Sequence, residues 1–319
     1  MISETIGTPV LYVGFTLLVI VLLAVDFLVL KTQGTHRVGV KEAAAWSVVW
    51  IIVALTFCGW FWWYVDENFG RELANEKALQ FFTGYLIEKS LAVDNVFVWI
   101  TLFSFFAVPA EFQKRVLLYG VLGAIVMRAV LIYAGALLLA KFHWILYIFG
   151  LFLLLTGVKM LVFAKHEPDL EKNPVLRWMR GHMKITNEYH GERFFVVKQG
   201  IRYATPMFVV LVLVEVTDLI FAVDSIPAIF AVTGDPFIVF TSNIFAILGL
   251  RAMYFLLADM ADRFPLLKYG LAVILIFIGI KMLLLDIYKI PVGVALAIVG
   301  LILLISVAAS LIVSRRTIK

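Results

Sequence analysis

Long apolar runs alternate with short charged segments along the whole chain. Nine runs are bounded by charges, proline or glycine, and each reaches the roughly 20 residues that a helix needs to cross the hydrocarbon core of a bilayer. The pattern predicts an all-α, polytopic membrane protein with about nine transmembrane helices. The predicted spans are residues 10–30, 43–64, 79–107, 116–140, 143–163, 204–232, 237–259, 266–286 and 291–313.

The composition agrees with a membrane protein. The 319 residues are 63% hydrophobic and 15% charged, which is more apolar sequence than a soluble core needs. The net charge of +5 could suit a nucleic-acid binder, but the basic residues lie mostly in loops between the apolar runs, so no nucleic-acid partner is expected. Residues 1–9 carry Glu4 and no Lys or Arg. The first run is therefore expected to be a span and not a secretory signal.

The lysine and arginine residues predict the orientation of the chain. Eighteen of them lie on one side of the predicted spans, four lie on the other side and five lie within spans. Because basic residues accumulate in cytoplasmic loops, the N-terminus is expected outside and the C-terminus in the cytoplasm. The five within spans are Lys89, Arg128, Lys159, Arg251 and Lys281.

One long loop, 164–203, is predicted on the cytoplasmic side. It is mixed in charge and contains amphipathic pieces such as LRWMRGHMK. It is interpreted as a connector or a short surface helix, with a docking or sensing element as the alternative. The single cysteine, Cys58, excludes an intrachain disulfide and is interpreted as a small apolar filler.

Two acidic motifs of similar sequence lie in different spans. When EKSLAVDNVF (88–97) is aligned with DLIFAVDSIP (218–227), the sequence AVD matches AVD and Glu88 falls on Asp218. Downstream, LGAIVMRA resembles LGLRAMYF and GVKMLV resembles GIKMLL, so an arginine and a lysine recur in the same order. The chain is therefore predicted to contain an internal repeat.

Each repeat would contain three spans. An odd number of spans gives the two repeats opposite orientations in the bilayer, which is the inverted-repeat plan of many secondary transporters, with the substrate site near the midplane. The expected organisation is two accessory helices in 1–70, the first repeat in 71–163, the loop in 164–203, the second repeat in 204–287, and a last helix with a cytoplasmic tail in 288–319.

Five acidic residues lie well inside the predicted spans. An aspartate at the centre of a span costs about 2.5–3.5 kcal/mol on insertion scales, so these groups must be paired, hydrated or bound to a ligand. They are Glu88, Asp94, Glu215, Asp218 and Asp224.

The intramembrane bases can compensate only part of this acidic set. Arg128 and Arg251 lie mid-span and are the expected partners. Lys159 and Lys281 lie nearer span ends, where their ammonium groups can snorkel. Lys89 adjoins Glu88 but points about 100° away from it on a helix. All five bases are interpreted as charge-compensating or gating residues.

Pro227 predicts a break in the second motif. It removes a backbone donor and clashes with the carbonyl of Val223, so the helix is expected to kink or unwind at 223–227. On a straight helix Asp224 lies opposite Glu215, and such a break would swing it toward the other acids. Non-helical backbone at membrane depth is tolerated where it lines a cavity.

Amide and hydroxyl groups accompany the carboxylates. Asn95 and Ser225 follow the two AVD sequences, Thr217 lies in the same span as Ser225, and Asn243 lies in the next span, 237–259. An all-oxygen set suits hard divalent cations such as Mg²⁺, Ca²⁺ and Mn²⁺. Carboxylates that share a site repel one another, so an entering cation would displace protons. This is the basis of a metal/proton exchange hypothesis.

The motifs EKSLAVDN, EVTDLIFAVDSIPA and LGLRAMYF resemble the TerC family of bacterial integral membrane proteins. The resemblance runs from AAAWSVVW to GIKMLLLD, nearly the whole chain. It implies Mn²⁺ efflux across the bacterial cytoplasmic membrane, with a role under alkaline or metal stress. It also implies that the five intramembrane acids are metal-path residues. Because Asn95 corresponds to Ser225, the site is expected to be asymmetric.

Three functions other than metal export are alternatives for this sequence. A non-transport membrane scaffold that couples metal supply to exported metalloproteins is the main alternative. An anion site would instead use Arg128 and Arg251 as ligands, but the motif-bearing helices carry an excess of acid. An enzyme is not expected, because Gly-x-Gly-Asp, His-Glu-x-x-His and Gly-x-Ser-x-Gly are absent from the sequence.

The expected partners are a divalent metal ion as the transported substrate, protons and membrane lipid. No bound cofactor is expected. The residues alone leave open the choice among the three metals, the coupling ion and the oligomeric state.

Overall fold

The structure is a computed structural model that describes residues 5–33, 38–142, 144–162, 173–258, 266–288 and 290–317. The first part of the predicted loop, 164–172, lies outside the described residues.

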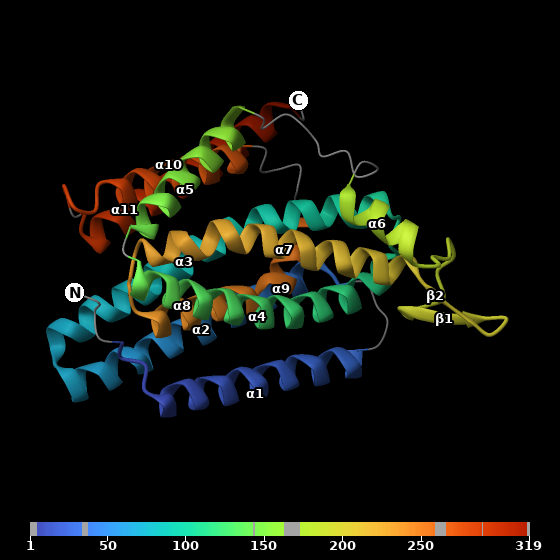
Figure 1. The fold of residues 1–319 in the computed structure, drawn as a ribbon, viewed down its shortest axis with the longest axis horizontal. Helices are drawn as coiled ribbons and strands as arrows, with labels where there is room; N and C mark the ends of the chain where they lie inside the picture. The colour runs from blue at the N-terminus through green and yellow to red at the C-terminus, as the bar shows by residue number, and fades with distance from the viewer. Residues whose placement is uncertain are drawn as a thin grey trace.

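Helices form nearly all of the described chain, in agreement with the predicted all-α class. In chain order, the helices before the long loop are α1 (Pro9–Gln33), α2 (Val40–Phe69), α3 (Arg71–Phe105), α4 (Ala110–Lys141) and α5 (Ile145–Val162). After the loop come α7 (Pro206–Phe230), α8 (Pro236–Leu248), α9 (Leu250–Ala258), α10 (Leu267–Leu283) and α11 (Val292–Thr317). Figure 1 shows these helices running side by side, with α1 at one edge and α5, α10 and α11 at the opposite edge.

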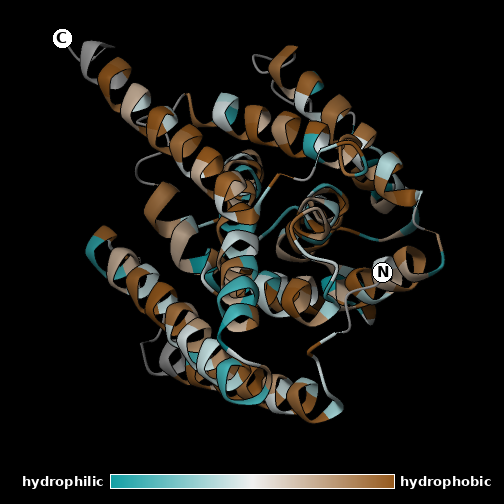
Figure 2. Ribbon diagram, turned by 90° about the vertical axis from the view of Figure 1, so that its left-hand side faces the viewer, coloured by the Kyte–Doolittle hydropathy of each residue, from teal (hydrophilic) through white to brown (hydrophobic). Residues whose placement is uncertain are grey.

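The outer surface of the bundle is apolar, as a lipid-facing surface must be. Large hydrophobic side chains are exposed along α1, α2, α4, α5 and α11, and Figure 2 shows helices at the rim of the bundle coloured mostly as hydrophobic. In water such a surface would drive aggregation. The chain is therefore a multi-pass membrane protein.

Six described helices are long and apolar enough to cross a membrane, and the bent pair of α8 and α9 brings the number to seven. Helices also lie at the two remaining predicted spans. However, α10 has only 17 residues, and the last 18 residues of α3 contain three charges, Glu88, Lys89 and Asp94. The count of nine membrane spans therefore stays a prediction.

The helices of the two predicted repeats pack reciprocally. In the predicted repeats, α3 corresponds to α7, and α4 corresponds to α8 together with α9. Helix α3 packs against α8, and α7 packs against α4. The remaining counterparts, α5 and α10, pack against each other. This exchange of partners is what a two-fold relation between the repeats requires, although the inverted repeat itself stays a prediction.

Glycines allow α5 and α10 to approach closely. A Cβ atom built at Gly279 would lie 2.6 Å from the backbone nitrogen of Leu154 and 2.8 Å from the carbonyl oxygen of Gly150. A Cβ at Gly157 would lie 2.7 Å from the carbonyl oxygen of Ala272. Small residues at such contacts are the usual way in which membrane helices bring their backbones together.

Helix α7 continues through Pro227 to Phe230. The unwinding predicted at 223–227 is therefore wrong. Pro227 lies in the last turn of the helix, where its missing N–H removes a single hydrogen bond, and the side chains of Ile226, Ala228 and Ile229 are buried and hold the turn in place.

A helix break occurs instead in the span 237–259. Helices α8 and α9 are bent by 41° relative to each other, with Gly249 between them. The break lies within the LGL part of the motif LGLRAMYF, where no proline marks it.

The described part of the long loop contains more structure than a connector. Helix α6 (Pro174–His182) confirms the predicted short surface helix, and Leu176 and Met179 pack into the core formed by the ends of α3, α4 and α7. Strands β1 (Phe195–Lys198) and β2 (Ile201–Ala204) form an antiparallel hairpin that the sequence analysis did not predict.

We predict that Gly279→Ala destabilises the protein by roughly 1–3 kcal/mol, the usual cost of overpacking. The added methyl group would meet backbone atoms of α5, which cannot move aside as a side chain can. Thermal unfolding of the purified protein in detergent micelles measures the effect.

The matched control is Gly300→Ala in α11, where no heavy atom lies within 4 Å of the added Cβ. It should leave the unfolding temperature unchanged or raise it, because alanine favours helix over glycine by about 1 kcal/mol. Equal unfolding temperatures for the two variants would contradict the close contact.

Candidate functional site

A buried arginine lies between the two acidic motifs. Arg128 of α4 pairs with Glu88 of α3 and, on its other side, with Asp218 of α7. Its Nη2 lies 3.0 Å from Oδ1 of Asp218 and its Nε lies 3.2 Å from Oδ2. The exposed fraction of the Arg128 side chain is 0%, and that of each carboxylate is 1%. Arg128 thus pairs with two of the five intramembrane acids.

Amide and hydroxyl groups complete this cluster. Asn243 of α8 donates from Nδ2 to Glu88 at 3.0 Å, and Asn95 of α3 donates from Nδ2 to Asp218 at 3.2 Å. Arg128 also donates to the hydroxyl oxygen of Ser225 at 3.3 Å. The cluster has two carboxylates and one guanidinium, so its charged form carries one net negative charge.

A small cavity of about 30 Å³ lies beside this cluster. Three carboxylates line it, those of Glu88, Asp94 and Asp224. The other polar groups at its wall belong to Asn95, Arg128 and Ser225, and Met160 of α5 and Leu275 of α10 close it on the far side. The volume corresponds to roughly one water molecule.

The acids of each motif face two different sides because of their spacing. Residues six positions apart on a helix point about 120° apart. Glu88 and Asp218 therefore face α4 and α8, where Arg128 and Asn243 meet them. The charge of Lys268 of α10 acts on Asp94. The hydroxyl of Thr156 of α5 donates a hydrogen bond to Asp224 at 3.4 Å.

Asp94 and Asp224 are thus the less compensated pair. Their charges act on each other, and Lys159 lies close enough to act on Asp224. Among the described residues, neither Asp94 nor Asp224 has an ion pair as close as those of Arg128 with Glu88 and Asp218. Asp94 and Asp224 are only partly buried.

Glu215 lies one turn before Asp218 and outside the cavity. Its carboxylate points at Gly123 of α4, where any Cβ would collide with it. Its charge interacts with that of Asp218, and its side chain makes no hydrogen bond or ion pair within the described part of the chain. Gly123 was not predicted, and the only sequence signal for it is a glycine in the repeated LGA motif.

Arg251 does not join the acidic motifs. It forms an ion pair with Asp26 of α1, and its Nη1 atom is buried without a hydrogen-bond partner in the described structure. The prediction that Arg251 compensates the motif acids is therefore wrong. Asp26 was missed, although it is visible in the sequence as a charge inside the apolar run 10–30.

The three lysines occupy different surroundings. Lys89 donates from Nζ to the carbonyl oxygen of Ala246 at 3.2 Å, in the last turn of α8, where a cation is favoured by the helix dipole. Gly249 makes room for it, because a Cβ there would lie 2.5 Å from Nζ. Lys159 is exposed, as expected of a snorkelling side chain, while Lys281 is largely buried.

Within the described residues, no group of three or more Asp, Glu, His or Cys side chains is arranged to hold a metal ion. The acids lie at one crossing of α3 and α7 but are divided between two sides. Binding a metal by three of them would therefore require a rearrangement of side chains or helices.

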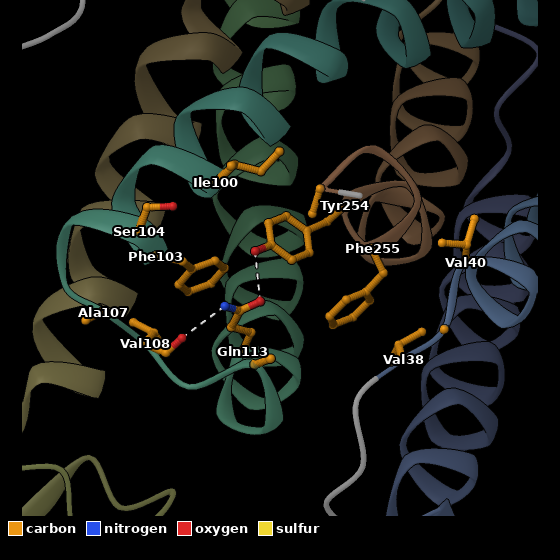
Figure 3. A pocket seen from close by; sticks show the side chains of 13 residues that line it. Val38, Val40, Ile100, Phe103, Ser104, Ala107, Val108, Gln113, Tyr254 and Phe255 are labelled. Atoms are coloured by element: carbon orange, nitrogen blue, oxygen red, sulfur yellow. Dashed lines mark hydrogen bonds between the residues drawn. The ribbon is translucent and has the colours of Figure 1, made fainter. Parts of the chain in front are cut away.

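A larger cavity of about 710 Å³ lies near the ends of α3, α4 and α9 (Figure 3). Most of the residues in its wall have apolar side chains, and none has a carboxylate. Gln113 donates to the carbonyl oxygen of Val108 at 3.0 Å and accepts a hydrogen bond from the hydroxyl of Tyr254 at 2.9 Å, as Figure 3 shows. This cavity offers no charged ligand for a metal.

The fold and site define a multi-pass helical membrane protein with a cluster of charged residues buried at the crossing of two helices. The family model "Integral membrane protein TerC family" matches residues 73–318. The chain therefore belongs to the TerC family.

Similar proteins cover nearly the whole chain. A protein of Escherichia coli (strain K12), described as "Putative membrane-bound redox modulator Alx", is 60% identical over 93% of this chain and 92% of its own length. The protein of Photorhabdus laumondii with the same description is 53% identical over 98% of both chains. An "Uncharacterized membrane protein STKORF319" of Myxococcus xanthus is 48% identical over 98% of this chain and 95% of its own. No solved structure matches.

We predict that Arg128→Met destabilises the protein by about 3–5 kcal/mol, because Glu88 and Asp218 would be left buried without a positive partner. Adding Glu88→Gln and Asp218→Asn should recover much of that stability. Thermal unfolding in detergent measures both effects.

The matched control for Arg128→Met is Arg71→Met, which removes an ion pair to Asp66 in which the arginine side chain is 66% exposed. Exposed pairs contribute only about 0–1 kcal/mol. If Arg128→Met proved no more destabilising than this control, the buried cluster would not have the energetic role given to it here.

A second prediction concerns the break between α8 and α9. Gly249→Ala should displace the ammonium of Lys89 and lower the unfolding temperature, and the same change should cost less when combined with Lys89→Ala. Residues in direct contact usually show coupling energies of about 0.5–3 kcal/mol in such a double-mutant cycle. Gly59→Ala, at an open helical position, is the control, and strictly additive effects would argue against the contact.

Proposed function

We propose that the protein exports divalent metal cations, with Mn²⁺ as the main substrate, across the bacterial cytoplasmic membrane. The observation that carries this proposal is the cavity at the crossing of α3 and α7, where the carboxylates of Glu88, Asp94 and Asp224 meet amide and hydroxyl groups. Charged groups at this depth are costly and are typically retained for transport or binding.

The chemistry of the cavity suits a hard cation. Its oxygen atoms come from carboxylates, from the amide of Asn95 and from the hydroxyl of Ser225, and such ligands are preferred by Mg²⁺, Ca²⁺ and Mn²⁺. The preference for Mn²⁺ rests on the resemblance of the sequence motifs to the TerC family and not on the ligand atoms.

In this proposal the guanidinium of Arg128 competes with the metal ion for the carboxylates of Glu88 and Asp218. Its guanidinium lies between Glu88 and Asp218, the position from which a divalent cation could be held by both motifs. When the metal binds, Arg128 moves away from at least one carboxylate. When the metal leaves, Arg128 returns, so the emptied site does not retain two uncompensated buried negative charges.

Asp94 and Asp224 would receive the cation first. They lack the direct arginine contacts of the other pair, and their mutual repulsion favours either a bound cation or protonation. A cation that arrives there displaces protons, and protons that return expel the cation. This gives metal/proton exchange without any additional cofactor.

Alternating access would come from the two repeats. The reciprocal packing of α3 with α8 and of α7 with α4 supports two related units that can rock against each other about the shared site. The distribution of basic residues supports an orientation with the N-terminus outside and the C-terminus in the cytoplasm.

A membrane scaffold that couples metal supply to exported metalloproteins is the second candidate. It is favoured by the folded cytoplasmic elements, α6 and the β1–β2 hairpin, which are more than a connector requires. The relatives' description as redox modulators finds less support in the residues of this chain, because Cys58 is its single cysteine and its thiol lies against the carbonyl oxygen of Ala78.

We predict that purified wild-type protein in liposomes takes up Mn²⁺ when a proton gradient is imposed, and that Asp94→Asn and Asp224→Asn each lower the uptake at least tenfold. Neutralising either acid removes a ligand from the cavity while preserving its shape. Uptake is measured with a fluorescent metal indicator trapped in the vesicles.

The control is Asp286→Asn, which removes a carboxylate that lies outside the cavity and accepts a hydrogen bond from Tyr147. It should leave uptake unchanged. Uptake that survives in both cavity variants would refute the assigned metal path. Absence of Mn²⁺, Ca²⁺ and Mg²⁺ uptake by well-folded wild type would refute the exporter and favour the scaffold.

A further inference from the structure

A cavity of about 520 Å³ lies between α6 and the ends of two central helices. Phe105 and Phe106 at the end of α3 and Val209 in the first turn of α7 form part of its apolar wall. Arg180 and Asn187 contribute the polar part. The cavity therefore combines an apolar lining with a cationic group.

The cavity lies at the level where the helices leave the membrane. Helix α3 ends at Phe105 and α7 begins at Pro206, and Figure 1 shows α6 beside this end of the bundle. The side chains of Phe105 and Trp178 are 43% and 58% exposed. Exposed aromatic side chains at span ends are typical of the boundary between the hydrocarbon core and the headgroups.

Arg180 has no counter-charge in the described structure. Its guanidinium makes no hydrogen bond or ion pair there, and the same holds for the neighbouring Arg177 and Lys184. Two acids in the described part of the same loop are already engaged: Glu188 accepts from Lys198 at 2.8 Å, and Glu192 accepts from Arg115 at 3.0 Å. The hydrogen bond from Lys198 holds the pKa of Glu188 below its usual value. The cavity is thus complementary to an anion.

We propose that this cavity binds an anionic phospholipid, with the headgroup phosphate on Arg180 and the first part of an acyl chain along the apolar wall. A guanidinium matches the geometry of a phosphate, and basic residues at the membrane surface attract anionic lipids. A small hydrated anion would gain nothing from the phenylalanine side chains, so we assign the site to a lipid. This site is separate from the proposed metal path and does not depend on it.

Binding there would stabilise α6 against the bundle. Leu176 of α6 lines the cavity and is also part of the core cluster that contains Trp99 of α3 and Val210 of α7. A lipid in the cavity would therefore bridge the cytoplasmic helix and the ends of the two helices that carry the acidic motifs.

The test measures retained lipid by native mass spectrometry of the full-length protein. After delipidation and incubation with equal amounts of phosphatidylglycerol and phosphatidylcholine, wild type should retain several-fold more phosphatidylglycerol. Arg180→Gln should reduce that retention about fivefold, which is the effect expected for one basic residue at a membrane surface. Its unfolding temperature in lipid-free detergent should stay that of wild type, because the side chain has no hydrogen bond or ion pair within the described residues.

The matched control is Arg193→Gln, which removes an exposed arginine of the same loop that lies outside the cavity wall. It should retain phosphatidylglycerol as wild type does. An equal loss in both variants would overturn the proposal, because the attraction would then come from the charge of the loop as a whole. Equal retention of the two lipids by wild type, or full displacement by millimolar inorganic phosphate, would also overturn it.

Discussion

The ion-pair cluster around Arg128 is the constraint on which the centre of the molecule depends. A guanidinium with an exposed fraction of 0% is tolerated at this depth only because Glu88 and Asp218 approach it from two different helices. Those contacts in turn determine how α3, α4 and α7 cross. Asn95 and Asn243 orient the two carboxylates, so the positions of four helices are coupled through one charged group. Structure and candidate function thus share the same residues.

The spacing within the acidic motif explains why a single crossing can hold two kinds of acid. The second acid of each motif lies six positions after the first, and that spacing places the two acids on different sides of their helix. One side meets an arginine, and the other meets hydroxyl and ammonium groups on α5 and α10. The pair that Arg128 compensates, Glu88 and Asp218, therefore lies on one side of the two helices. The less compensated pair, Asp94 and Asp224, lies on another side.

Much of this arrangement could be predicted from the sequence, because charges in apolar runs are rare and their spacing is informative. The helical class, the two acidic motifs and the role of Arg128 followed from that. Arg128 and Arg251 each follow an LG sequence in the two predicted repeats, but Arg251 pairs with Asp26 on a helix outside the repeats. Pro227 predicted a break by a local rule, but tertiary packing near the end of α7 preserves the helix. The break at Gly249 has no proline to mark it in the sequence, and the close approach of Lys89 to this glycine is visible only in the fold.

The glycine contact between α5 and α10 has a mechanical consequence. The backbones of α5 and α10 touch at Gly150 and Gly279. The two helices cannot slide or separate without losing contacts along their interface, so we expect them to move as one rigid pair. This pair contributes Met160 and Leu275 to the wall of the small cavity, beside the helices that carry the acids. A tilt of this pair of helices would change the width of the space beside Asp94 and Asp224, and it would at the same time alter the contacts of α5 with α7 and of α10 with α11.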